Sequence, residues 1–156
     1  FEVRSIAEEI AARRHQHRCE VLTLERVQAN AIQASALNVN ENDVIFHSIM
    51  VHYENDLPVQ IEDRCVNADI AVDYLTQDYR QTTPHAYLSR IAPLTEGEHI
   101  VEAVRATAQE CAWLTIKEHE PCLLIRRTTW SASRIVSHAR LLFPGSRYRL
   151  QGRFIS

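Results

Sequence analysis

Strand-like segments dominate the pattern of apolar and polar positions along the chain. A half-buried strand alternates apolar with polar residues, and a buried strand is a short apolar run between turn residues. The segments that fit these patterns are residues 19–27, 44–53, 57–66, 97–106, 122–130, 135–143 and 148–154. The pattern therefore predicts a sheet built from short strands.

Short helices are expected between these strands. Ser5 can cap a helix, because Glu8 three residues later completes a capping box. Thr83 can cap another, with Pro84 at its first helical position. Two more helical segments are expected at residues 29–37 and 109–115. Strands in hairpins with a few helices between them indicate an α+β fold with a mainly antiparallel sheet.

The clearest local signal is a β-hairpin. Residues 44–53 predict one strand, residues 54–56 (Glu-Asn-Asp) its turn, and residues 57–66 the return strand. Pro58 has no backbone N–H, so it must lie at the start of its strand or at a position without a ladder hydrogen bond. The return strand of this hairpin carries alternating polar residues.

Gln60, Glu62 and Arg64 alternate along the return strand and therefore share one face of it. One interpretation is the wet side of a half-buried sheet. The other is the polar floor of a pocket, where Glu and Arg together can hold a ligand that has both a hydrogen-bond donor and a carboxylate. The spacing alone leaves both open. Arg126 and Arg127 interrupt an apolar strand, so one must point inward or lie at an edge, with a structural salt bridge as the default explanation.

Composition narrows the class of protein. The chain has 156 residues, 46% apolar and 24% charged, which is typical of one soluble globular domain. No apolar run is long enough for a membrane span and no signal-peptide pattern opens the chain, so we expect a cytoplasmic protein without a membrane partner. A net charge of −3 argues against nucleic-acid binding by this part alone. Because residue 1 is Phe, we expect the natural polypeptide to begin earlier.

Signatures of catalysis and of metal binding are weak. The sequence has no Walker loop, GxGxxG, GxSxG or HExxH motif, so we expect neither an enzyme nor a cofactor. His15, His17 and Cys19 could share a strand face around a metal, but a solvated connector is the preferred interpretation because no fourth ligand is indicated. The cysteines form no CxxC pair and are interpreted as reduced and partly buried.

The hairpin sequence is similar to that of a known protein family. The run from Val44 through Asn55 and Pro58 to Glu62 resembles the hairpin of the UTRA effector-binding domain in GntR-type repressors of the HutC subfamily. Three further motifs match that family in order and spacing, at residues 83–88, 121–128 and 143–148. The resemblance implies a chorismate-lyase-like α+β fold, a mainly antiparallel sheet with helices on one side. It covers nearly the whole chain.

The resemblance also implies a domain organisation and partners. Residues 1–18 would be a linker and short helix that follow a missing N-terminal winged helix-turn-helix, and residues 19–156 the UTRA domain. Operator DNA would bind through the missing domain of a homodimer, and a small molecule would act as inducer. The opening (residues 1–6) and the tail (residues 144–154) are most similar to members that control histidine utilisation, for which the implied inducer is urocanate.

Site residues are carried over from the family position by position. The family's pocket falls on Met50, His52, Glu62, Thr83, His85, Ser137 and Phe143. Relatives that sense sugar phosphates have arginines in place of Met50 and His52 and a glutamate in place of Ser137. The loss of two cations argues against a phosphate ligand and suits a flat, weakly charged one.

Within this pocket the two ends of urocanate have separate expected partners. Glu62 and His52 would hold the imidazole, and Thr83 at the Pro84 helix start would hold the carboxylate. Arg64 is the candidate counter-charge, although the family does not place it in the pocket. Two alternatives are a lyase-like enzyme acting on an aromatic or unsaturated acid, and a dimerisation domain whose pocket is filled by Met50, Phe143 and their neighbours.

Overall fold

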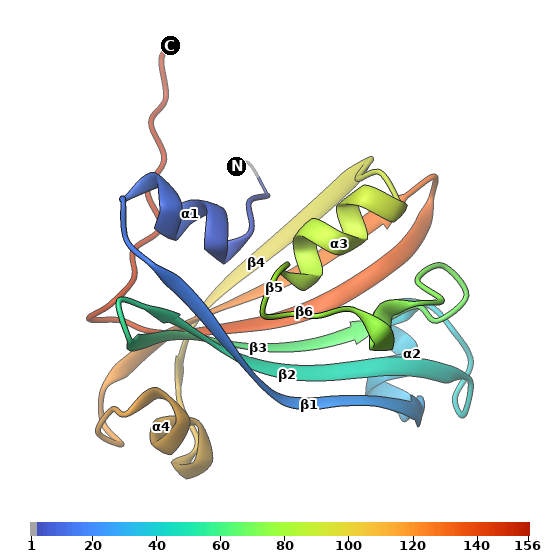
Figure 1. Ribbon diagram of the computed structural model, residues 1–156, viewed down its shortest axis with the longest axis horizontal. Helices are drawn as coiled ribbons and strands as arrows, with labels where there is room; N and C mark the ends of the chain where they lie inside the picture. Colours follow the sequence, from blue (N-terminus) through green and yellow to red (C-terminus); the bar gives the residue numbers. More distant parts are fainter. Residues whose placement is uncertain (1–2) are drawn as a thin grey trace.

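One antiparallel sheet organises the chain. The computed structural model describes residues 3–156, so Phe1 and Glu2 of the expected opening motif and linker lie outside the described residues. The strands follow the order β1-β2-β3-β6-β5-β4 across the sheet (Figure 1). Their bounds are β1 His17–Gln28, β2 Val44–Glu54, β3 Leu57–Val66, β4 Glu96–Arg105, β5 Pro121–Ser131 and β6 Arg134–Pro144. Every neighbouring pair is antiparallel, as the hairpin pattern predicts.

Local sequence explains where the helices begin. The helices are α1 Ile6–Ala12, α2 Ala31–Leu37, α3 Pro84–Ile91 and α4 Ala108–Leu114, with a 3₁₀ turn at Tyr74–Thr76. Ser5 accepts from the Glu8 N–H and Glu8 accepts from the Ser5 N–H, which confirms the predicted capping box. Thr83 accepts from the Ala86 N–H at the start of α3, also as predicted.

Two tight turns fix the strand register. Asn55 and Asp56 between β2 and β3 have φ angles of 47° and 63°. Ala132 and Ser133 between β5 and β6 have φ angles of 48° and 70°. Positive φ at both central residues twists a hairpin in the direction that its strands prefer. The first turn therefore sets the alternation that brings Glu62 and Arg64 onto one face of the sheet.

The helices divide between the two faces of the sheet. Ile6 and Ile10 of α1 pack on Leu141 and Phe143, on the face that also carries Glu62. The first residues of α3 lie over this face as well, beside α1 (Figure 1). We call this face the α1/α3 face.

The opposite face has its own apolar cover. Leu114 of α4 packs with Ile61, Leu124 and Leu142, whose side chains point away from the α1/α3 face. Ala34 and Leu37 of α2 pack farther along the same side, near Ile45 and Cys65. The predicted α+β class and antiparallel sheet are confirmed, but the prediction that the helices lie on one side of the sheet is wrong. Alternating strands buried on both faces need cover on both.

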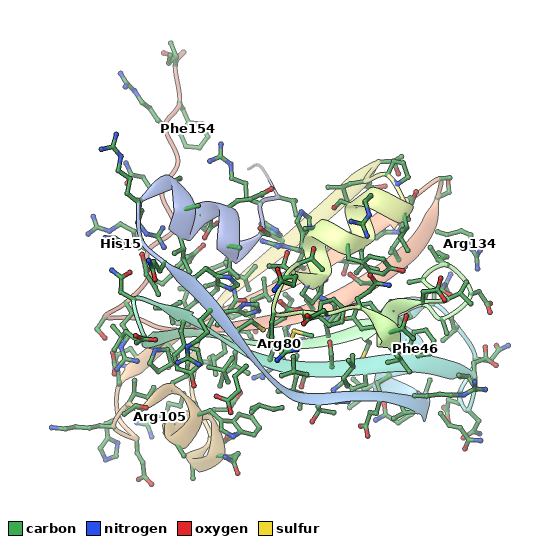
Figure 2. The ribbon with its side chains drawn as sticks, viewed as in Figure 1. His15, Phe46, Arg80, Arg105, Arg134 and Phe154 are labelled. Atoms are coloured by element: carbon green, nitrogen blue, oxygen red, sulfur yellow. The ribbon has the colours of Figure 1, made fainter. Side chains whose placement is uncertain are left out.

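The C-terminal segment departs from the sheet. The predicted strand at residues 148–154 is wrong, because these residues form no strand. Arg147 is held by the carbonyl oxygens of Pro58 and Leu114, at 2.8 and 2.6 Å from Nη1. Beyond it the chain extends past α1, and Phe154 on this tail is 91% exposed (Figure 2). β6 already has β3 and β5 on its two sides, so no sheet edge is open beside it.

Candidate functional site

Glu62 is the centre of a buried polar cluster on the α1/α3 face. Its Oε1 lies 2.9 Å from His52 Nε2, and its Oε2 accepts from Arg64 Nε at 2.9 Å. Burial opposes ionisation, but Arg64 and His52 outweigh it and hold the pKa of Glu62 well below its ordinary value. Glu62 is therefore a carboxylate with a paired cation, inside a sheet where an unpaired charge would be costly.

The cluster continues across the sheet in both directions. Arg64 Nη1 donates to Ser137 Oγ at 2.8 Å, and Ser137 Oγ lies 3.2 Å from Thr129 Oγ1. On the other side, His52 Nδ1 lies 2.8 Å from His17 Nε2, and the two rings stack. A hydrogen-bonded line thus runs from β1 to β5, so each member's position depends on its neighbours.

A narrow hollow, partly open to solvent, lies above Glu62 on the α1/α3 face. We call it the central hollow. Its walls come from the start of α1, the start of α3, and strands β3, β5 and β6. Its lining residues are Arg4, Ser5, Ile6, Glu9, Gln60, Glu62, Arg64, Thr83, His85, Arg127, Leu141, Phe143 and Tyr148. Its free volume of about 10 Å³ has room for about one water molecule, so a ligand would have to move the lining side chains apart.

The charges lining the central hollow are unequal. Three arginines and two glutamates line it, which gives one net positive charge. His85 does not add to this, because burial and the nearby Arg64 and Arg127 lower its pKa to about 4. At neutral pH the hollow therefore complements a ligand with a single negative charge.

A second, equally narrow hollow lies under α3 and is also partly open to solvent. Arg64 and His85 line both hollows, so the two meet at these side chains. Ser137 lines the second hollow. A ligand larger than the central hollow alone would extend in this direction.

The predicted site residues fall into two layers. Glu62, Arg64, Thr83, His85 and Phe143 line the central hollow. Ser137 bonds to Arg64 from the side of the second hollow. Met50 and His52 are fully buried behind Glu62 and line neither hollow. Met50 packs in an apolar cluster with Tyr74 and Tyr79. The alternative of a filled pocket stays open, because the free volume beside Phe143 is only about 10 Å³.

Arg127 is the site residue that the sequence reasoning left outside the pocket. Of the Arg126–Arg127 pair, Arg127 points inward and is 7% exposed, while Arg126 forms a surface ion pair with Glu102. The alternation along β5 contained this signal, because Arg127 shares its face with Ile125 and Thr129. The default explanation, a structural salt bridge, applies to Arg126 and not to Arg127.

The HxHxC string does not form a metal centre. Within residues 3–156 no group of three or more His, Cys, Asp or Glu side chains is arranged to hold a metal ion. His15 pairs with Glu54, whereas His17 stacks on His52. The four cysteines are all free thiols, as expected.

Comparisons with known proteins agree with this architecture. The UTRA domain family matches residues 12–149. The chain is 75% identical over 154 residues to a histidine utilization repressor of Klebsiella aerogenes and 61% identical over 156 residues to that of Pseudomonas aeruginosa, covering 99% and 100% of this chain. It spans 64% and 62% of those relatives' lengths. The crystal structure of the C-terminal domain of a Pseudomonas syringae histidine utilization repressor superposes with a TM-score of 0.87 at 57% identity, covering 90% of this chain and all of that one.

The chain therefore belongs to the UTRA domain family. The α+β, chorismate-lyase-like fold implied by the resemblance is confirmed. The relatives are named transcriptional repressors and not enzymes, which sets the lyase-like alternative aside. No helix within residues 3–156 is long and apolar enough to cross a membrane.

Acid should weaken the folded state before its carboxylates titrate. Burial, with His52 nearby, lowers the pKa of His17 to about 4, and burial with Arg64 and Arg127 does the same for His85. Between pH 6.5 and 4 the unfolded chain therefore binds more protons than the folded one, so stability falls as the pH falls. His47, whose pKa is raised chiefly by its hydrogen bond to Asp63, acts in the opposite direction.

Urea unfolding at pH 7.5, 6.5 and 5.5 measures this effect. We expect the free energy of unfolding to decrease at each step, and to decrease less in the variant His85→Gln. A free energy that stays constant or rises towards pH 5.5 would contradict the assignment of His17 and His85 as half-buried, neutral histidines.

Proposed function

We propose that this chain is the effector-binding and dimerisation domain of a transcriptional repressor of histidine-utilisation genes, and that the central hollow binds urocanate or a related small acid. The single positive charge of the hollow is the observation that carries the proposal. Urocanate at neutral pH has one carboxylate and an uncharged imidazole, whereas a sugar phosphate has up to two negative charges. The relatives' printed names supply the histidine connection.

The lining chemistry supports recognition of both ends of such a ligand. Glu62 has further acceptor sites beyond those used by His52 and Arg64, and can accept an imidazole N–H. Thr83 accepts from the Ala86 N–H, and its own hydroxyl proton is a donor suited to a carboxylate. Phe143 stacks on Tyr148 and offers an apolar wall for a flat ring.

The remaining predicted residues have supporting roles in this proposal. His85 and Arg64 lie where the two hollows meet, and Ser137 fixes the Arg64 guanidinium. His52 fixes Glu62 from behind, and Met50 fills the space beneath. Together with Glu62, Thr83 and Phe143, these five residues would form the effector site.

The repressor as a whole would consist of this domain and a DNA-binding part. A winged helix-turn-helix before residue 1 would bind operator DNA, residues 1–18 would be the linker, and residues 19–156 the effector domain. A cytoplasmic homodimer would present two DNA-binding heads. Effector binding would change their relative placement and release the operator.

Isothermal titration calorimetry of this chain tests the ligand. We expect urocanate to bind with a stoichiometry of one per chain, and histidine and a sugar phosphate to bind at least about tenfold more weakly, because each mismatched charge in a buried site costs about 1.4 kcal/mol or more. Tighter binding of the sugar phosphate than of urocanate would overturn the proposed ligand class.

A further inference from the structure

Arg127 is a buried cation whose surroundings differ from those of Arg64, the other buried arginine that lines the central hollow. It lies on β5 and is 7% exposed. Nε donates to His99 Nε2 at 2.8 Å, and Nη1 donates to the backbone carbonyl of Arg4 at 3.3 Å. Both partners are neutral acceptors. Within residues 3–156 Arg127 forms no ion pair with an Asp or Glu.

Arg64 is already paired with a carboxylate, whereas Arg127 has no carboxylate partner within residues 3–156. Arg64 bonds directly to the Glu62 carboxylate, and Glu62 and Glu9 act on Arg127 only from a longer distance. Burial and the Arg64 cation lower the pKa of Arg127 to about 10, so it remains charged at neutral pH. A buried cation without an adjacent anion is held at an energetic cost, which a bound carboxylate would relieve.

The guanidinium has one end suited to a carboxylate. Two parallel N–H groups at Nη1 and Nη2 form a fork that binds both carboxylate oxygens. No acceptor within residues 3–156 bonds to Nη2, and the Nη1 bond to Arg4 is the longer of the two that Arg127 makes. A carboxylate that takes this fork leaves the His99 bond intact and competes with the Arg4 carbonyl.

We propose that Arg127, rather than Arg64, receives the effector's carboxylate, and that it gives up the Arg4 carbonyl when it does so. The inference rests on the proposed function of the central hollow and adds to it a specificity-determining residue and a route for the signal. Thr83 remains a second donor to the same carboxylate from the start of α3.

Loss of the Arg4 contact would act on α1. Arg4 precedes Ser5, which caps α1, and Ile6 and Ile10 hold α1 to the sheet. The Arg127–Arg4 bond joins residues 123 positions apart and ties the start of α1 to β5. In the proposed domain order, α1 is the element that follows the DNA-binding head, so the carboxylate would loosen the element nearest to that head.

The first test combines protein variants with a ligand variant. Calorimetry compares urocanate with its uncharged amide on the wild-type chain and on Arg127→Met. We expect the wild type to prefer the acid about 10- to 100-fold, the range for a charge-assisted hydrogen bond, and Arg127→Met to bind both ligands with equal affinity. Arg126→Met is the matched control, since it removes a cation one residue away on the opposite face, and it should keep the preference.

The second test follows α1 directly. Hydrogen exchange of the α1 amides should speed up when urocanate binds to the wild type and to Arg126→Met. In Arg127→Met it should be fast without ligand and unchanged by it. Circular dichroism checks folding, and if Arg127→Met does not fold, Arg127→Lys serves instead. That variant keeps the charge without the fork and should lose about tenfold in affinity for the acid.

The outcomes separate the two proposals. No binding of urocanate to the wild type would overturn the proposed function itself. If urocanate binds to the wild type and Arg127→Met keeps the full preference for the acid, only the assignment of Arg127 is overturned. The same holds for Arg127→Lys where that variant is used. Loss of the preference without faster exchange in α1 would leave Arg127 as the carboxylate partner and refute the route through Arg4.

Discussion

The variant Glu62→Gln is expected to lose about 3–5 kcal/mol of folding free energy, because it leaves the buried Arg64 cation without its partner. Arg64→Met should lose a similar amount by leaving Glu62 without its cation. The double variant Glu62→Gln/Arg64→Met should lose less than the sum of the two, since neither lone charge remains. Urea unfolding of the four proteins gives the coupling free energy directly.

The control for this cycle is an ion pair of the same type on the surface. Arg126 and Glu102 have side chains that are 48% and 41% exposed, with a contact of 2.8 Å. Glu102→Gln should therefore cost about 1 kcal/mol or less. Equal losses in Glu62→Gln and Glu102→Gln would show that the central pair is not buried as described. A Glu62→Gln chain stable enough to titrate should also bind urocanate more weakly, because a lining acceptor has changed its charge.

Local signals were sufficient to predict the elements around the site. The Ser5 capping box, the Thr83 cap before Pro84 and the hairpin turn at Asn55 each depend on residues a few positions apart. Period-two alternation then placed Glu62 and Arg64 on one face. These features depend only on neighbouring residues, so they could be predicted correctly from the sequence.

Long-range packing decided what the sequence could not predict. The pattern at residues 148–154 is that of a strand, but a strand also needs an open sheet edge, and β6 has neighbours on both sides. The distribution of helices between the faces depends on which apolar stripe meets which helix, as for Leu114 on Leu142. Neither condition is visible in a local window of residues.

The site residues also differ in whether the sequence could predict them. The resemblance indicated Glu62, Thr83, His85 and Phe143, which do line the central hollow. Arg127 joins the hollow through its bond to the Arg4 carbonyl, a contact made across 123 positions of the chain. The alternation along β5 groups Arg127 with Ile125 and Thr129, and the packing of Ile125 with Ile6 and Ile10 of α1 shows which face of β5 this group lies on.

The proposed release of operator DNA by urocanate can be measured in the full-length protein. Fluorescence anisotropy of labelled operator DNA would give the dissociation constant of the full-length protein with and without saturating urocanate. We expect urocanate to weaken operator binding about 5- to 150-fold, the usual range of coupling between two sites, and a sugar phosphate at the same concentration to leave it unchanged. Operator affinity that does not change with urocanate would contradict a urocanate-sensing role for this domain.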